Sequence, residues 1–241
     1  DVYKRQMSPI SNDSIGDFVI NSCKKIGINT LLLEKVSNLK NTLAIVDTMG
    51  EKTNAVLYRE KPADLFIDET FLKKVNLDSY LMIIVTGTSL SRNPSRNNVL
   101  KLMELAIKRK IEIVLDIDYR EGSWDDKKKA EKTLYSASLL SNIVVGNDLE
   151  FNFMSSVKNR GLSLASTLSK KNRITTIYKM GSKGLFYFDK NNKHFFKSFK
   201  VKSIKPTGAG DAFISSFCSS KLRGVELSKS IKFGAAAGAI V

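Results

Sequence analysis

Residues 111–120, Ile-Glu-Ile-Val-Leu-Asp-Ile-Asp-Tyr-Arg, join a short apolar run to a polar loop that carries two carboxylates and an arginine. The same design occurs at three further apolar runs that lead into polar loops, at 81–85, 142–145 and 174–178. Amphipathic segments alternate with these runs, at about 95–109, 126–140 and 161–170. Strands that alternate with helices form right-handed βαβ units, so the sequence predicts an α/β fold with a mostly parallel sheet and helices on both faces.

The segments on either side of this alternation predict smaller elements. A helix with one buried face is predicted near the start, from the helical spacing of Ile15, Phe18, Val19, Ser22, Cys23 and Ile26. Residues 42–47 and 53–58 are strand-like and flank a turn at 49–52, which predicts a small β hairpin. The last part of the chain predicts a second hairpin and two helices, at 185–188 with 194–196, 211–222 and 226–240.

The composition is typical of a soluble globular protein, because 42% of the 241 residues are hydrophobic and 26% are charged. No apolar run approaches the roughly 20 residues that a membrane-spanning helix requires, and the start has no signal-peptide pattern. We therefore expect a cytoplasmic protein with no membrane partner. Cys23 and Cys218 lie far apart in helical patterns, which favours two buried thiols over a disulfide.

The formal net charge of +15 raises a different class of function, a non-catalytic α/β protein that binds nucleic acid. The lysines are scattered over predicted helix faces and turns, however, and no aromatic-plus-basic ribonucleoprotein motif accompanies them. We interpret the charge as a solvated surface and expect no nucleic-acid partner. The single histidine, His194, lies in a predicted surface hairpin and argues against a His-ligated metal cluster.

The polar loops that follow the four strands are expected to gather at one edge of the sheet. Ligands of open α/β sheets bind beyond the carboxyl ends of the parallel strands. The loops that occupy this place begin with Thr86-Gly87-Thr88, Asp116 to Arg120, Asn147 to Glu150, and Lys179 to Gly184. Carboxylates, glycines and cations in four such loops favour a crevice that handles phosphate.

Residues 207–213, Thr-Gly-Ala-Gly-Asp-Ala-Phe, are the most informative loop in the chain. Small residues let a ligand approach the backbone, and the helix that follows presents unpaired N–H groups to an anion. Asp211 could accept a proton from a hydroxyl during phosphoryl transfer, or it could simply cap the helix. Neither G-x-x-x-x-G-K-[ST] nor a G-x-G-x-x-G after a strand occurs, so a nucleotide would have to be held in another way.

The Gly-Ala-Gly-Asp-Ala-Phe string resembles the signature of the ribokinase-like (PfkB) kinases. The resemblance implies that Asp211 is the catalytic base and that the backbone amides of Gly208, Ala209 and Gly210 form an anion hole. It also implies a nucleotide side formed by Lys179, Gly181, Gly184 and Asn147. Asn147-x-x-Glu150 resembles the family's N-x-x-E motif, in which the glutamate orders magnesium through water. The resemblance thus implies ATP and Mg²⁺ as cofactors, although Lys179 could also simply solvate the strand end.

Four segments look most like the family members that phosphorylate 5-dehydro-2-deoxy-D-gluconate in myo-inositol breakdown: Tyr58 to Asp64, Thr86 to Thr88, Asp116 to Arg120 with Trp124, and Lys205-Pro206. This likeness implies a sugar-acid substrate whose carboxylate faces Arg59 and Arg120, with Asp118 beside them, because a guanidinium matches a carboxylate bidentately. Arg59 could instead be a surface charge. The alternative substrates within the family are 2-keto-3-deoxygluconate and fructose.

The resemblance covers about residues 11–241, and residues 1–10 match nothing. Relatives carry further strands and a Gly-Gly segment before this region, and their helix at 234–241 continues further. Ala235 also stands where relatives often have asparagine. We therefore expect a partial kinase domain with little activity on its own, and a possible homo-oligomer in a full-length form.

Overall fold

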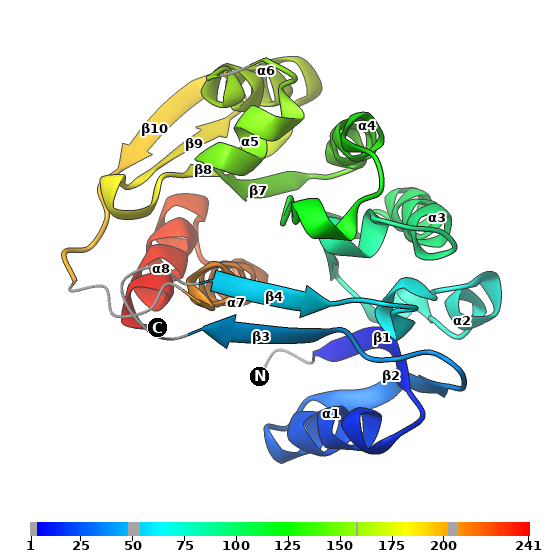
Figure 1. Ribbon diagram of the computed structural model, residues 1–241. Helices are drawn as coiled ribbons and strands as arrows, with labels where there is room; N and C mark the ends of the chain where they lie inside the picture. Colours follow the sequence, from blue (N-terminus) through cyan, green and yellow to red (C-terminus); the bar gives the residue numbers. More distant parts are fainter. Residues whose placement is uncertain (1–3, 48–53, 158, 202–206) are drawn as a thin grey trace.

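The computed structural model describes residues 4–47, 54–157, 159–201 and 207–241. Its centre is a six-stranded sheet with the strand order β10-β9-β8-β7-β6-β5 (Figure 1). Four neighbouring strands run parallel: β5 (Met82–Thr86), β6 (Glu112–Asp116), β7 (Ile143–Asn147) and β8 (Thr175–Lys179). The antiparallel strands β9 (Leu185–Asp189) and β10 (Asn192–Phe196) extend the sheet beyond β8. The predicted α/β fold with a mostly parallel sheet is confirmed.

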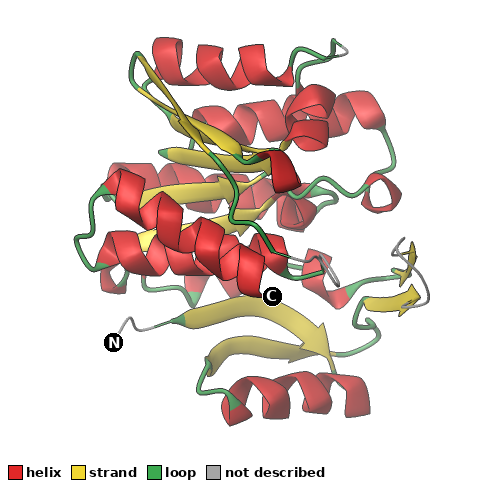
Figure 2. Ribbon diagram, turned by 90° about the vertical axis from the view of Figure 1, so that its left-hand side faces the viewer, coloured by secondary structure: helices red, strands yellow, loops and turns green. Residues whose placement is uncertain are grey.

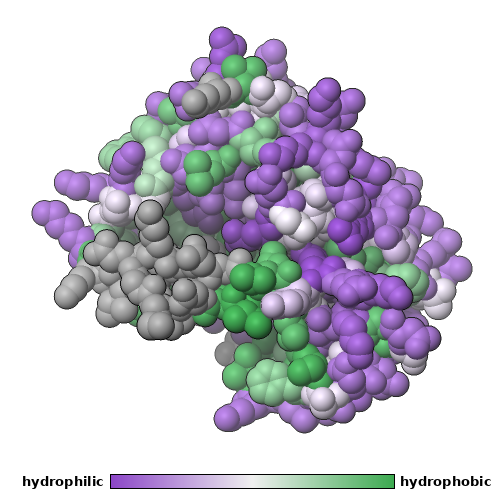
Figure 3. Space-filling view, in the orientation of Figure 1, coloured by the Kyte–Doolittle hydropathy of each residue, from purple (hydrophilic) through white to green (hydrophobic). Residues whose placement is uncertain are grey.

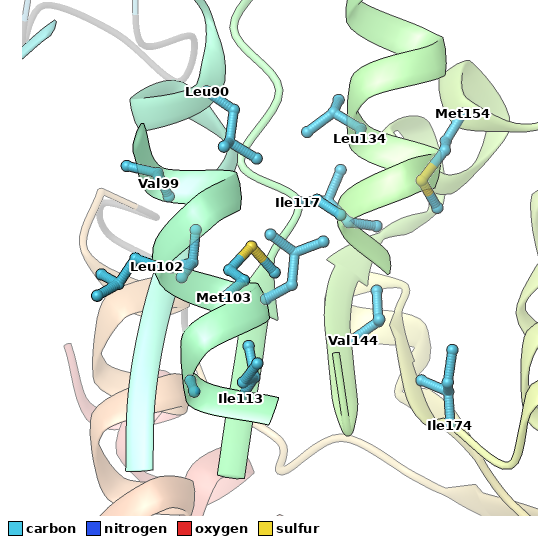
Figure 4. Packing of buried hydrophobic residues seen from close by; sticks show 14 of the residues in the cluster. Leu90, Val99, Leu102, Met103, Ile113, Ile117, Leu134, Val144, Met154 and Ile174 are labelled. Carbon is cyan, nitrogen blue, oxygen red and sulfur yellow. The ribbon is translucent and has the colours of Figure 1, made fainter. Parts of the chain in front are cut away.

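Helices cover both faces of this sheet (Figure 2). One face packs against α3 (Ser95–Lys108), α4 (Lys127–Leu139), α5 (Asp148–Met154) and α6 (Gly161–Asn172). The other face packs against α7 (Ala209–Leu222) and α8 (Leu227–Ile240). Side chains alternate along a strand, so Ile113 and Leu115 join the first core layer, between the sheet and α3 to α6. Val114 joins the second core layer, between the sheet and the helices α7 and α8. Figure 4 shows part of the first layer, in which Met103, Ile113, Leu134 and Val144 lie between α3, α4 and the sheet.

Two small sheets lie outside the central one. β1 (Arg5–Ser11) pairs in parallel with β2 (Asn29–Val36), and the helix that connects them is α1 (Ser14–Lys25). β3 (Leu43–Asp47) and β4 (Asn54–Tyr58) form the predicted hairpin, whose predicted turn at 49–52 lies outside the described residues. Short helices lead from the hairpin to β5: η1 (Ala63–Leu65), α2 (Glu69–Lys73) and η2 (Leu77–Ser79).

The prediction of a helix near the start is confirmed, but the prediction that its apolar face is buried is wrong. Ile15, Phe18 and Ile26 are 40%, 69% and 72% exposed. The main contacts of the helix are with the two strands of the β1–β2 sheet, which leave part of its apolar face uncovered. β1 itself starts within residues 1–10, to which the sequence assigned no element.

The surface in Figure 3 is largely hydrophilic, and its hydrophobic patches gather over the lower part of the molecule, where β1–β2, β3–β4 and α1 lie. Both cysteines are free thiols, as expected, but only Cys218 is buried and Cys23 is half-buried. His194 lies exposed on β10. Among the described residues, no helix has the length and apolar character needed to cross a membrane.

Candidate active site

The polar loops after the parallel strands lie at one edge of the sheet, as the sequence predicted. The strand registers pair Thr86 with Asp116 and Asn147 with Lys179, so the strands end side by side. The backbone at Gly87 approaches the loop after β6 so closely that an added Cβ atom would lie 2.0 Å from the carbonyl oxygen of Ile117. The absence of a side chain at Gly87 therefore allows the first two loops to meet.

The start of α7 brings Asp211 to the same edge. Gly208 caps the helix in a left-handed conformation with φ of 89°, and no side chain among the described residues caps α7, so its first N–H groups are available to an anion. Lys179 lies against this helix start, because a Cβ atom on Gly210 would be 3.6 Å from its Nζ atom. The Nζ atom also lies 5.5 Å from the centroid of the Phe213 ring. The structure thus joins an ammonium group to the predicted anion site.

Carboxylates crowd this edge and perturb one another. Burial raises the pKa of Asp116 to about 7, although Lys179 opposes the shift, and the negative charges of Glu150, Asp118 and Asp211 add to it. Burial also raises the pKa of Asp118 and the pKa of Glu150. Such mutual repulsion is relieved when a cation or a proton enters the cluster.

Asn147 and Glu150 form a capping box at the start of α5. The Asn147 side chain accepts a hydrogen bond from the Glu150 N–H at 2.9 Å, and Glu150 Oε2 accepts one from the Asn147 N–H at 2.7 Å. Glu150 is only 7% exposed. The N-x-x-E pattern therefore has a clear structural role in addition to the magnesium role that the resemblance implies.

The oxygen-rich cluster fits Mg²⁺ better through water than through direct coordination. Among the described residues, no group of three or more His, Cys, Asp or Glu side chains is arranged to hold a metal ion directly. Mg²⁺ usually keeps several waters and binds one or two carboxylates together with substrate phosphates. Binding through water requires only carboxylates near the ion. Four carboxylates lie close enough for their charges to interact: Asp116, Asp118, Glu150 and Asp211.

Arg120 and Asp118 form the part of the site next to this cluster. The Arg120 guanidinium donates to Asp118 at 2.8 Å, and the Thr88 hydroxyl donates to the same carboxylate at 3.1 Å. Asp118 adopts a positive φ of 31°, which is unusual for a residue with a side chain. The Arg120 side chain is 59% exposed and helps to line a cavity of about 310 Å³ with Asn147 and Glu150. Arg120 is thus both fixed by Asp118 and accessible to a ligand.

Arg59 lies deeper than Arg120 and makes different contacts. Its side chain is 10% exposed, and its terminal nitrogens reach Asp64 at 2.5 Å and Ser123 at 2.8 Å. Ser123 belongs to η4 (Glu121–Ser123), the short helix directly after Arg120. Arg59 is therefore mostly shielded from solvent and paired with Asp64, while its role in binding a substrate stays a prediction. The contacts with Asp64 and Ser123 were not predicted from the sequence, which gives no local signal for them.

The turn between β8 and β9 holds the predicted nucleotide-side glycines. Gly181 and Gly184 have positive φ angles of 57° and 100°, and they bracket η5 (Gly181–Lys183). A Cβ atom on Gly184 would lie 2.3 Å from the carbonyl oxygen of Phe196. These glycines are therefore needed for a tight turn, whatever ligand it meets. The Lys205-Pro206 segment of the resemblance lies outside the described residues.

Comparison with known proteins identifies the family to which the chain is similar. The chain matches the sequence model described as pfkB family carbohydrate kinase over residues 6–241. A 5-dehydro-2-deoxygluconokinase of Clostridium perfringens is 31% identical over 241 residues, which cover 96% of this chain and 70% of that protein.

Two solved structures share the fold. A sugar kinase from Pyrococcus horikoshii in complex with ATP has a TM-score of 0.83 and 24% identity, and the match covers 99% of this chain and 76% of that one. Fructokinase from Vibrio cholerae O395, bound to fructose, ADP and a calcium ion, has a TM-score of 0.82 and 18% identity, with 98% and 78% of the two chains covered. The family match, with the signature loop at the edge of a ribokinase-like sheet, shows that the chain belongs to the pfkB family of carbohydrate kinases and is a sugar kinase, a transferase.

Proposed function

We propose that the protein phosphorylates a hydroxyl of a sugar acid with ATP, and that 5-dehydro-2-deoxy-D-gluconate is the acceptor. The observation that carries the choice of a sugar acid is the position of Arg120, a guanidinium that is accessible to a ligand at the same edge as Asp211. Guanidinium groups bind carboxylates through strong, charge-assisted hydrogen bonds. Curated relatives named 5-dehydro-2-deoxygluconokinase, about 30% identical to this chain, support the specific substrate.

In this proposal Asp211 is the general base. The substrate hydroxyl attacks the γ-phosphorus of ATP, its proton passes to the Asp211 carboxylate, and the bond between the γ-phosphorus and the bridging oxygen breaks to release ADP. Negative charge on the transferring group meets the N–H groups of Gly208, Ala209 and Gly210 at the start of α7. Lys179, which lies against that helix start, adds a positive charge next to the phosphates.

The remaining residues divide between the nucleotide and the sugar acid. Gly181 and Gly184 form the turn beside which the nucleotide would lie, and Asn147 holds the start of α5 in place next to it. Arg120, Asp118 and Arg59 form the sugar-acid side. Mg²⁺, when bound, would neutralise charge on the phosphates, and Glu150 with its neighbouring carboxylates would hold its waters.

The substrate proposal is tested by measuring ADP formation with a panel of acceptors: 5-dehydro-2-deoxy-D-gluconate, 2-keto-3-deoxygluconate and fructose. The chain spans about 70% of the length of its curated relatives, so turnover is measured in a version completed to that length, and binding is measured in the chain itself. We expect the highest kcat/KM for 5-dehydro-2-deoxy-D-gluconate. Equal turnover of fructose would contradict the sugar-acid assignment, while a preference for 2-keto-3-deoxygluconate would retain it and change the substrate.

A further inference from the structure

A partly buried hydrogen-bond network joins the β3–β4 hairpin to the sugar-acid side of the site. Asp64 lies in η1 and contacts both legs of the hairpin at its base. Its Oδ1 atom accepts a hydrogen bond of 2.7 Å from the hydroxyl of Thr42, the residue before β3. Its Oδ2 atom accepts one of 2.5 Å from Arg59, the residue after β4. One carboxylate therefore holds the two ends of the hairpin together.

Asp64 is held on a rigid support. Its neighbours in η1, Ala63 and Leu65, are 0% and 3% exposed, so the short helix is part of the core. The backbone of Ala63 also donates to the carbonyl oxygen of Lys40 at 2.7 Å, next to the first leg of the hairpin. The backbone that carries the Asp64 carboxylate is therefore held in place by the packing of η1.

The network continues from Arg59 to the loop that carries Arg120. Arg59 donates to the hydroxyl of Ser123, which is 1% exposed and lies in η4. The Nε atom of Arg59 is buried and, within the part of the chain that the structure describes, has no hydrogen-bond partner. A buried donor without a partner is costly, which is typical of a group that meets a ligand in another state. Asp64 and Ser123 thus fix the guanidinium and leave one of its donors free.

The Asp64–Arg59 pair differs from the ordinary ion pairs on this protein. Arg59 and Asp64 are 10% and 35% exposed, whereas Arg109 and Asp78 are 41% and 74% exposed. Exposed pairs contribute little to stability or to geometry, whereas a buried guanidinium strongly depends on its acceptor. Asp78 therefore provides a matched control for Asp64.

We propose that Asp64 is a positioning residue for the sugar-acid side, which holds Arg59 and both legs of the β3–β4 hairpin in the arrangement that binds the substrate carboxylate. This inference rests on the proposed function for its ligand. The clamp itself is a property of the protein without ligand. The two parts can therefore be tested separately.

The test uses Asp64→Asn, Arg59→Ala and their double variant, with Asp78→Asn as the control. Trp124 is the single tryptophan of the chain and follows Ser123, so its fluorescence reports on the end of the network. In the absence of ligand, Asp64→Asn and Arg59→Ala should shift the Trp124 emission in the same way, and the double variant should add little. Asp78→Asn should leave the emission unchanged.

The second measurement is the binding of 5-dehydro-2-deoxy-D-gluconate and of ATP to the same variants. Asp64→Asn should weaken sugar-acid binding about tenfold and leave ATP binding within about twofold. The double variant should bind no more weakly than Arg59→Ala alone, because both changes act through the same guanidinium. Ser123→Ala, which leaves the Asp64–Arg59 pair intact, should weaken sugar-acid binding in the same direction and replaces Asp64→Asn if that variant does not fold.

Three results would overturn the inference. Tighter sugar-acid binding in Asp64→Asn would show that Asp64 competes with the ligand for Arg59. Additive losses in the double variant would show that the two residues act independently. An unchanged Trp124 emission in a folded Asp64→Asn protein would show that no clamp reaches η4. A wild-type protein that binds ATP but no sugar acid would instead refute the proposed substrate, and the Trp124 measurement would still decide on the clamp.

Discussion

Replacement of Asp211 by asparagine separates its proposed role as a base from a role in the start of α7. The side chain is exposed and lies in the first turn of the helix, after the left-handed cap residue Gly208. An amide of the same size can occupy this place, but it cannot accept the proton of the substrate hydroxyl. The two roles therefore predict losses in different measurements.

The magnitudes differ enough to distinguish the two roles. Loss of a negative charge at a helix N-terminus costs about 0.3 to 1 kcal/mol of stability, and relief of repulsion from Asp116 and Asp118 offsets part of that cost. The free energy of unfolding should thus change by less than about 1 kcal/mol. Loss of a general base lowers the rate by about 10² to 10⁴, which raises the barrier by roughly 2.7 to 5.4 kcal/mol.

The assay measures kcat, ATP affinity and thermal unfolding on one preparation of the completed enzyme. Asp148→Asn is the matched control, because Asp148 also lies in the first turn of a helix at the same edge of the sheet. We expect a normal melting temperature and normal ATP binding for both variants, with kcat lost only in Asp211→Asn. A folded Asp211→Asn enzyme within about threefold of the normal kcat would show that Asp211 is not the base.

Three further predictions follow from the site geometry. Arg120→Ala should raise the KM for the sugar acid and leave the KM for ATP nearly unchanged, and an equal rise in both would contradict its place on the sugar side. The raised pKa of Asp116 means that the native protein holds this proton more tightly than the unfolded chain does, so stability should fall as the pH rises from about 4 to about 7. Asp116→Asn should flatten that pH profile and stabilise the ligand-free protein at pH 8 by about 1 to 4 kcal/mol, as measured by denaturant unfolding. Gly208→Ala should cost about 1 to 3 kcal/mol of stability, because its φ of 89° disfavours a side chain, and a variant as stable as the wild type would show that α7 can begin without this conformation.

The central sheet was predictable because each strand carries its own signal. Every predicted parallel strand is present, but each begins and ends one or more residues later than predicted. Thr86, Asp116 and Lys179 were assigned to loops as polar residues, whereas their backbones still pair with the neighbouring strand. The gathering of the polar loops at one edge followed correctly from the parallel direction of the strands.

Other elements depend on contacts between distant parts of the chain and were missed. β1 contains Pro9 and several polar residues, and it is a strand only because β2, more than 20 residues later, pairs with it. α5 has only seven residues and lacks a clear apolar period, yet Asn147 and Glu150 have the spacing of a capping box and could have indicated it. The Asp64–Arg59–Ser123 network was not predictable, since Ser123 is 64 residues from Arg59.

The two-sided packing of the sheet has a consequence for synthesis on the ribosome. The face that carries Val114, Val145 and Ile177 is covered by α7 and α8, which are translated after every strand of the central sheet. About 60 residues separate Ile177 from the end of α8. At a translation rate of about 5 to 20 residues per second, this apolar face stays exposed for roughly 3 to 12 s before α8 is complete. During that interval the nascent chain can bind a chaperone or aggregate. The same delay means that α7, which bears Asp211, can dock only after all six strands of the sheet have been translated.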